Sequence, residues 1–222
     1  MNYRNILYVL PGILVGLTLH EFCHGFAAYL LGDHTAKDEG RLSLNPLKHI
    51  DPIGFLFLII AGFGWAKPVR FNPQNLQFPR RDKAIIAAAG PVSNFILALV
   101  FIGLIRGWMG LPDHIASSER TEFIFSILYS SGFIVFMQVL YSAAMINLGL
   151  FVFNLFPIPP LDGSHIVFSG LNLSAETEHR IMRIGMPLLF VIIVIQNRTH
   201  IDILPIGKIV SALFNFFMPM PG

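Results

Sequence analysis

The 222-residue chain has a net charge of +2, and 54% of its residues are hydrophobic while only 13% are charged. Soluble domains carry about 25% charged residues, so this composition excludes an ordinary soluble domain and favours a multi-pass membrane protein. The small net charge gives no reason to expect a nucleic-acid partner. The single cysteine, Cys23, excludes a disulfide framework within the chain.

Three apolar runs are long enough to cross a bilayer as helices, which takes about 20 residues. They cover residues 6–31, 84–107 and 123–155. The first run is not a signal peptide, because it continues through Leu31 and contains a histidine motif. Of two shorter runs, 184–196 spans if it begins near Arg180, whereas 203–218 either spans with tilt or lies at the interface. We therefore expect an all-α polytopic membrane protein with about five to six membrane helices.

The apolar run 53–63 is too short to cross comfortably, so we expect it to be re-entrant or interfacial. With this arrangement most basic residues fall on one side of the membrane, which should be the cytoplasmic side. They are Lys37, Arg41, Lys48, Lys67, Arg70, Arg80, Arg81, Lys83, Arg180 and Arg183. The N-terminus then lies outside, and the first helix runs inward through what we expect to be the plasma membrane.

Two pieces of the connection after the first helix, GRLSLNP (40–46) and AKPVRFNP (66–73), alternate apolar and polar residues and end on Asn-Pro. This pattern predicts short strands at the membrane surface, which would form a small membrane-associated β region. No other segment resembles a repeat or a second soluble domain. We therefore expect one integral-membrane domain over residues 1–222, with a core over about 6–168 and C-terminal helices over about 174–222.

The first predicted span contains His20, Glu21 and His24 in the pattern H-E-x-x-H. Ionisable groups cost about 2.5–3.5 kcal/mol each in the middle of a membrane helix, so a chance pattern would be expected in a polar region instead. On a helix, positions i and i+4 lie about 40° apart, so both histidines can bind one Zn²⁺. Glu21 then stands beside the metal, as the general base of a metal-dependent hydrolase does.

Catalytic zinc usually takes three protein ligands and leaves the fourth position to water. The best candidate for the third ligand is Asp162 in NLFPIPPLDGSH (154–165), where a long apolar helix meets prolines that cannot continue it. Irregular backbone at membrane depth is tolerated only where protein covers it or water reaches it. His165 is the alternative third ligand. Asn94, in AGPVSN, either forms hydrogen bonds across helices or lines the cavity around the site.

Four segments in order, HEFCHGFAAYLLGDHTAKDEGRLSLNPLKHIDPIG, GWAKPV, AAGPVSN and FNLFPIPPLDGSHI, resemble the site-2 protease family of intramembrane zinc metalloproteases. The resemblance covers roughly residues 10–168 and is to short members without PDZ or CBS domains. It implies that His20, His24 and Asp162 bind one zinc ion and that Glu21 is the catalytic base.

The resemblance also implies that Asn154 contacts the substrate near the metal, and Asn94 is a second candidate for substrate binding. The segments 40–46 and 66–73 resemble the β region that receives an unwound substrate in this family, although Arg70 stands where many relatives have proline. The implied function is an endopeptidase that cuts within or near transmembrane segments. Its substrates would be membrane proteins such as single-pass regulators, or leftover signal peptides.

Two other classes of protein agree less well with these motifs than an endopeptidase does. A zinc-binding pseudoprotease that acts as a membrane chaperone or scaffold would not need Glu21 to bind zinc. A metal transporter would line a path through the membrane, often in inverted repeats, whereas these polar residues lie at one depth. We therefore expect transmembrane substrates and the lipid bilayer as partners, and the sequence leaves a homo-oligomer open.

Overall fold

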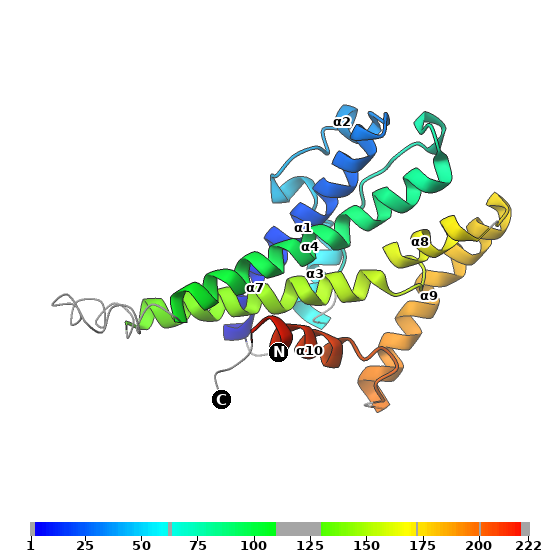
Figure 1. The fold of residues 1–222 in the computed structure, drawn as a ribbon. Coiled ribbons are helices and arrows are strands. Elements are labelled where there is room, and N and C mark those ends of the chain that lie inside the picture. Colours follow the sequence, from blue (N-terminus) through cyan, green and yellow to red (C-terminus); the bar gives the residue numbers. More distant parts are fainter. Residues whose placement is uncertain (1–2, 62–63, 110–129, 172, 200, 219–222) are drawn as a thin grey trace.

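The computed structural model describes residues 3–61, 64–109, 130–171, 173–199 and 201–218, and these parts of the chain are helical, with no strand (Figure 1). Three helices of the described part form the core, namely α1 (Tyr3–Leu30), α4 (Pro79–Met109) and α7 (Ser131–Leu155). The other helices there are α2 (Thr35–Asp38), α3 (Pro52–Ala61), α8 (Asp162–Gly170), α9 (Ala175–Thr199) and α10 (Ile206–Phe217).

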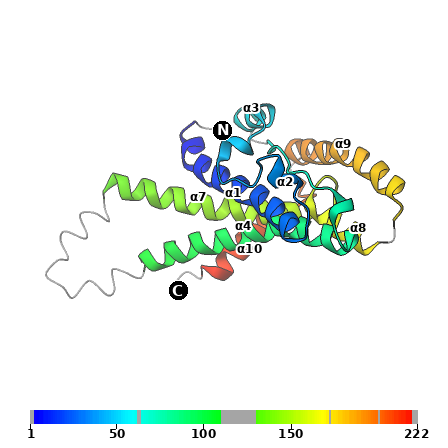
Figure 2. The ribbon, with the colours of Figure 1, turned by 90° about the horizontal axis from the view of Figure 1, so that it is seen from above.

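The three core helices are long and apolar enough to cross a membrane, with spans of 25 residues in α1, 31 in α4 and 25 in α7. Each of them contacts the other two, and α10 packs along α7 (Figure 2). The first two predicted spans are confirmed as helices of sufficient length and hydropathy to cross a membrane. The third is confirmed from residue 131 onward, while its predicted beginning at 123–129 lies outside the described residues.

The predicted total of five to six membrane helices is not confirmed. Among the described residues, only the three core helices are both long enough and apolar enough to cross a membrane. α9 has 25 residues, but four charged residues occupy its first half, namely Glu176, Glu178, Arg180 and Arg183. α10 has 12 residues, which extend about 18 Å, against a hydrocarbon core of about 30 Å. α3 has only ten residues and is also too short to cross.

α1 and α7 approach each other closely because small residues line the contact. A Cβ atom on Gly12 would lie 2.7 Å from the Cα of Ala143, and one on Gly16 would lie 2.6 Å from Oδ1 of Asn147. In lipid, such small residues allow the backbone-to-backbone packing that holds helices together. Next to α4 and α10, α7 instead packs through buried apolar side chains, including Leu140, Leu148, Ala98, Ile102 and Phe214.

The strands predicted over 40–46 and 66–73 are absent from the described chain. Both segments are irregular, and each ends in a short 3₁₀ turn, at Pro46–Lys48 and Pro73–Asn75. Between Ile50 and Ala66 there is an isolated antiparallel bridge. Of the prolines in these segments, only Pro68 lies inside one, where it has no N–H to donate to a strand ladder, while Pro46 and Pro73 begin the 3₁₀ turns.

Buried charged side chains hold these irregular segments in place instead. The guanidinium of Arg41 donates to the carbonyls of Lys48 and Lys67 and so ties the two segments together. Asp33, three residues after the end of α1, is fully buried. Its carboxylate accepts hydrogen bonds from Thr35 Oγ1 at 2.6 Å, Asn75 Nδ2 at 2.7 Å and the Asn72 backbone N–H at 2.8 Å.

Asp33 should make stability depend on pH. Burial alone would raise its pKa, but the hydrogen bonds to the charged form outweigh burial and hold the pKa below its usual value. Asp33→Ala should therefore lower the free energy of unfolding at about pH 7 by about 1.5–3 kcal/mol. Because the folded-state pKa is depressed, this contribution is complete above the unfolded-state pKa of about 3.9 and declines as the pH falls.

Thermal unfolding in detergent, followed from about pH 7 to about pH 3, checks this expectation. The difference between wild type and Asp33→Ala should narrow below about pH 4, whereas Asp38→Ala, at an exposed position on α2, should show no such difference. A difference of constant size across this range would contradict the role of the Asp33 carboxylate.

Candidate metal centre

The two histidines of the H-E-x-x-H motif lie one turn apart on α1, and their Nε2 atoms are 3.0 Å apart. Asp162 reaches them from a distant part of the chain. α7 ends at Leu155, and the proline-rich turn after it leads into α8, which begins at Asp162. Its Oδ2 lies 3.1 Å from Nε2 of His20 and 3.4 Å from Nε2 of His24. All three ligand atoms therefore lie within 4.8 Å of one another.

These three atoms fit a bound zinc ion. Two ligands that are each 2.0–2.1 Å from a tetrahedral ion lie about 3.3–3.4 Å apart, close to the separations found here. Asp162 Oδ2 is buried and has no hydrogen-bond partner, although buried polar atoms normally have one. Two imidazoles and one carboxylate are also a common ligand set of catalytic zinc.

α4 fixes the orientation of both imidazoles. Nδ1 of His20 donates to Oδ1 of Asn94 at 2.6 Å, and Nδ1 of His24 donates to the carbonyl of Ile86 at 2.7 Å. With the proton on Nδ1, each neutral imidazole directs the lone pair of Nε2 toward Asp162. Three electron-pair acceptors then face one another with no donor between them. A cation bound between them would accept all three lone pairs and so remove the repulsion between the acceptors.

Asn94 is fully buried and does not line the cavity of this site. Its Nδ2 donates to the carbonyl of Gly16 at 3.1 Å and to Oδ1 of Asn147 at 2.9 Å. Of the two predicted positions for Asn94, the structure therefore favours hydrogen bonding across helices. The candidate role of Asn94 in substrate binding stays a prediction, and in this structure its buried side chain is hydrogen-bonded to His20, Gly16 and Asn147.

Asn147 was not predicted from the sequence as part of the site. It is fully buried, and its Nδ2 donates to the carbonyl of Ala143 at 2.8 Å while its Oδ1 accepts from Asn94. An available signal was its spacing, since Asn147 lies seven residues, or about two helical turns, before Asn154 in an otherwise apolar run. Polar residues in such a run usually face the protein interior.

Glu21 is buried beside the histidines and lines the cavity of the metal centre. Its Oε2 accepts a hydrogen bond of 2.8 Å from the backbone N–H of Val69, in the irregular segment after α3. Glu21 does not belong to the cluster of ligand atoms. It is therefore placed as a carboxylate next to the metal position rather than as a ligand.

The cavity next to these residues has a volume of about 370 Å³. Asn154 lines it and donates through Nδ2 to the carbonyl of Leu150 at 3.0 Å, so its contact with a substrate stays a prediction. His165, the alternative third ligand, also lines the cavity, but its nitrogens do not belong to the cluster of ligand atoms. Burial lowers the pKa of its imidazole, which favours the neutral form.

A buried H-E-x-x-H helix with a carboxylate from a second segment is a ligand set typical of zinc hydrolases, and here it lies among helices long enough to cross a membrane. Comparison with known proteins agrees, because the model of peptidase family M50 matches residues 8–194. The chain therefore belongs to peptidase family M50, the site-2 protease family.

Several curated relatives carry a metalloprotease name. "Putative zinc metalloprotease YwhC" of Bacillus subtilis is 40% identical over 162 residues, which cover 72% of this chain and 67% of the relative. "Putative zinc metalloprotease Rip2" of Mycolicibacterium smegmatis is 35% identical over 172 residues, covering 75% and 58%. The Rip2 protein of Mycobacterium tuberculosis is 31% identical over 162 residues, covering 70% and 54%. This chain thus spans about half to two thirds of these relatives, and no solved structure matches it significantly.

Gly90 of α4 should be essential for metal binding because a side chain there has no room. A Cβ atom on Gly90 would lie 2.7 Å from Cε1 of His20 and would overlap Nε2 of His24. We expect Gly90→Ala to displace the imidazoles and to weaken zinc binding at least about tenfold in a chelator competition assay. Gly103→Ala, on the same helix with nothing within 4 Å of its Cβ, should bind zinc like wild type. Equal affinity of both variants would contradict this packing argument.

The acceptor oxygen of Asn94 should matter for zinc affinity independently of its amide donors. Asn94→Leu and Asn94→Asp both lose the donors to Gly16 and Asn147, but only the aspartate keeps an acceptor for His20 Nδ1. We expect zinc affinity to fall about 10–100-fold in Asn94→Leu and to stay close to wild type in Asn94→Asp. The same competition assay measures this, and an equal loss in both variants would argue against the positioning role.

Proposed function

We propose that this chain is a zinc-dependent intramembrane endopeptidase that hydrolyses peptide bonds within or near transmembrane segments of membrane proteins. One observation carries the proposal: His20, His24 and Asp162 converge around one point, beside a buried glutamate and a cavity, among helices long enough to cross a membrane. On this proposal, residues 1–222 form a single protease domain with its core over about 6–168.

The proposed chemistry assigns one task to each group. His20, His24 and Asp162 would hold a single zinc ion, and Asn94 holds His20 in the required orientation. A bound zinc ion supplies Lewis-acid polarisation of the peptide carbonyl and lowers the pKa of water. Glu21 takes the proton from the water that attacks the carbonyl carbon. It then returns this proton to the leaving amine as the C–N bond breaks.

The substrate of such an enzyme must unwind before it is cut, because a transmembrane helix uses its carbonyls in i→i−4 hydrogen bonds. The metal centre lies toward the C-terminal end of α1, next to exposed basic residues such as Lys37 and Arg70. The positive-inside rule then places this end at the cytoplasmic side, and we propose the plasma membrane as the location. Single-pass regulators and leftover signal peptides are the proposed substrates.

The alternative of a zinc-binding pseudoprotease needs the three ligands but not Glu21. The burial of Glu21 beside the ligands and at the wall of the cavity favours the peptidase, because a buried carboxylate without a role costs stability.

The substitution Glu21→Gln distinguishes an active peptidase from a zinc-binding pseudoprotease. The glutamine keeps the size of the side chain and an acceptor oxygen for the Val69 N–H, but it cannot accept a proton. We expect turnover of a model transmembrane substrate to fall at least about 1,000-fold while zinc affinity stays close to wild type. Glu39→Gln, at an exposed position at the end of α2, is the matched control and should cleave normally. Normal cleavage by Glu21→Gln would overturn the peptidase mechanism.

A further inference from the structure

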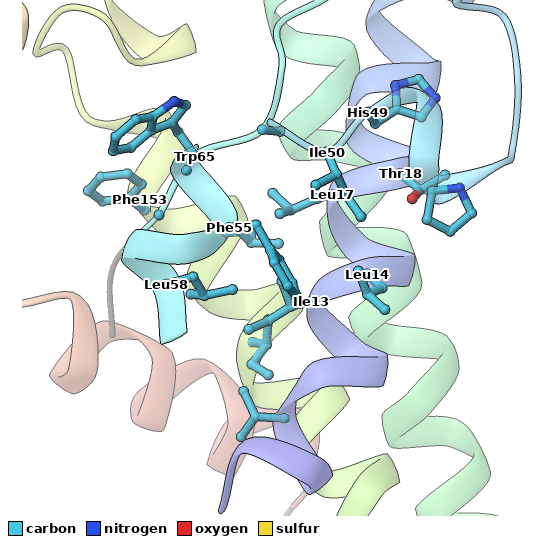
Figure 3. Close-up of a pocket in the computed structure, with 18 of the residues that line it drawn as sticks. Ile13, Leu14, Leu17, Thr18, His49, Ile50, Phe55, Leu58, Trp65 and Phe153 are labelled. Atoms are coloured by element: carbon cyan, nitrogen blue, oxygen red, sulfur yellow. The ribbon is translucent and has the colours of Figure 1, made fainter. Parts of the chain in front are cut away.

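A second cavity lies beside the metal centre, between α1, α3 and α7, and its volume is about 390 Å³ (Figure 3). Its walls are mostly apolar, with Ile13 and Leu17 from α1 facing Phe55 and Leu58 from α3. An apolar cavity of about 150 Å³ already holds a benzene molecule. This apolar cavity therefore has room for more than one large apolar side chain.

The apolar cavity adjoins the cavity of the metal centre. The two share six wall residues, which are Leu17, Gly64, Trp65, Ala66, Leu150 and Phe153. On α1, Ile13, Leu17 and Glu21 follow one another at intervals of four residues, so they lie along one face of the helix. This face leads from the apolar cavity to the proposed catalytic base over about 12 Å.

Along α1, the apolar cavity lies on the N-terminal side of the metal centre, in the direction of the middle of the span. It contacts α1 between Val9 and Thr18, from the N-terminal half of the span Ile6–Leu30 up to its middle, whereas the ligands His20 and His24 lie in the C-terminal half. An extended peptide advances about 3.3 Å per residue. A peptide bond held at the metal thus places residues within about four positions of it beside the apolar cavity, on the side toward the membrane interior.

We propose that the apolar cavity is a specificity pocket for large apolar side chains of the substrate, on the membrane-interior side of the bond that is cut. The proposal rests on the proposed peptidase function. A substrate side chain moves from lipid into this cavity, so the hydrophobic effect contributes little to its binding. Selection depends instead on van der Waals contact, which favours side chains that fill the cavity over small ones.

Gly149 of α7 allows this pocket to be filled by a single substitution. It lines the apolar cavity but not the cavity of the metal centre, and nothing lies within 4 Å of a Cβ built on it. We therefore expect Gly149→Leu to reduce the volume of the pocket, with no clash at its Cβ atom. Gly132→Leu is the matched control, since Gly132 lies on the same helix, has equally open space and lines neither of these two cavities.

The test uses full-length enzyme and a model transmembrane peptide with leucine or alanine at each of the four positions on the membrane-interior side. At one or more of these positions, wild type should cleave the leucine peptide about tenfold or more faster, measured as kcat/KM. Gly149→Leu should lose this preference, and Gly132→Leu should keep it. Zinc affinity, measured by chelator competition, should be the same in all three proteins.

Two results would overturn the pocket alone. One is a Gly149→Leu enzyme that keeps the wild-type preference for leucine. The other is a wild-type enzyme that cleaves the leucine and alanine peptides equally fast at all four positions, which is expected if a lipid chain rather than the substrate occupies the cavity. A wild-type enzyme with bound zinc that cleaves no transmembrane peptide would instead overturn the proposed function, and this pocket with it.

Discussion

The metal centre depends on the contact between α1 and α4 around the two histidines. Inside a membrane, each imidazole needs a partner for Nδ1, and α4 provides one for each through the Asn94 side chain and the Ile86 carbonyl. The same contact requires Gly90, because any larger residue would occupy the space of the rings. One helix thus carries the ligands, and its neighbour decides where the ligand atoms point.

The interruption of α7 completes this arrangement. Before the interruption, Asn147 connects Asn94 to the backbone of α1 and α7, and so anchors the hydrogen-bond chain that ends at His20. After it, the proline-rich turn allows α8 to begin beside α4, which it contacts extensively, and this brings Asp162 to the histidines. An uninterrupted α7 would carry Asp162 past the site, because a continuous helix moves about 1.5 Å along its axis per residue.

Much of the site could be predicted from the sequence because its signals are local. The spacing of His20 and His24 implies a shared face of one helix, and the prolines before Asp162 imply a broken helix at membrane depth. The hydrogen bond from the Val69 N–H to Glu21 could not be predicted, because every residue except proline has a backbone N–H and the sequence does not show where it points. The predicted strands failed for a related reason: alternation describes side chains, whereas a ladder requires paired backbone groups, and the described part of the connection between α1 and α4 has only an isolated bridge, between Ile50 and Ala66.

The two cavities differ in what forms their walls, and this difference suits hydrolysis within a membrane. The ligands of the metal centre lie on helices that pack tightly and are cross-linked by buried hydrogen bonds, so they can hold their positions while a substrate is bound. The apolar cavity is covered by α3, whose outward residues Ile53, Leu56 and Ile60 are exposed and which has little contact with the core helices. An unwound substrate segment has to keep its side chains in apolar surroundings while one of its carbonyls reaches a polar site. On the proposed function, an apolar cavity beside the one that holds the polar residues of the metal centre satisfies both requirements within about four residues of the substrate.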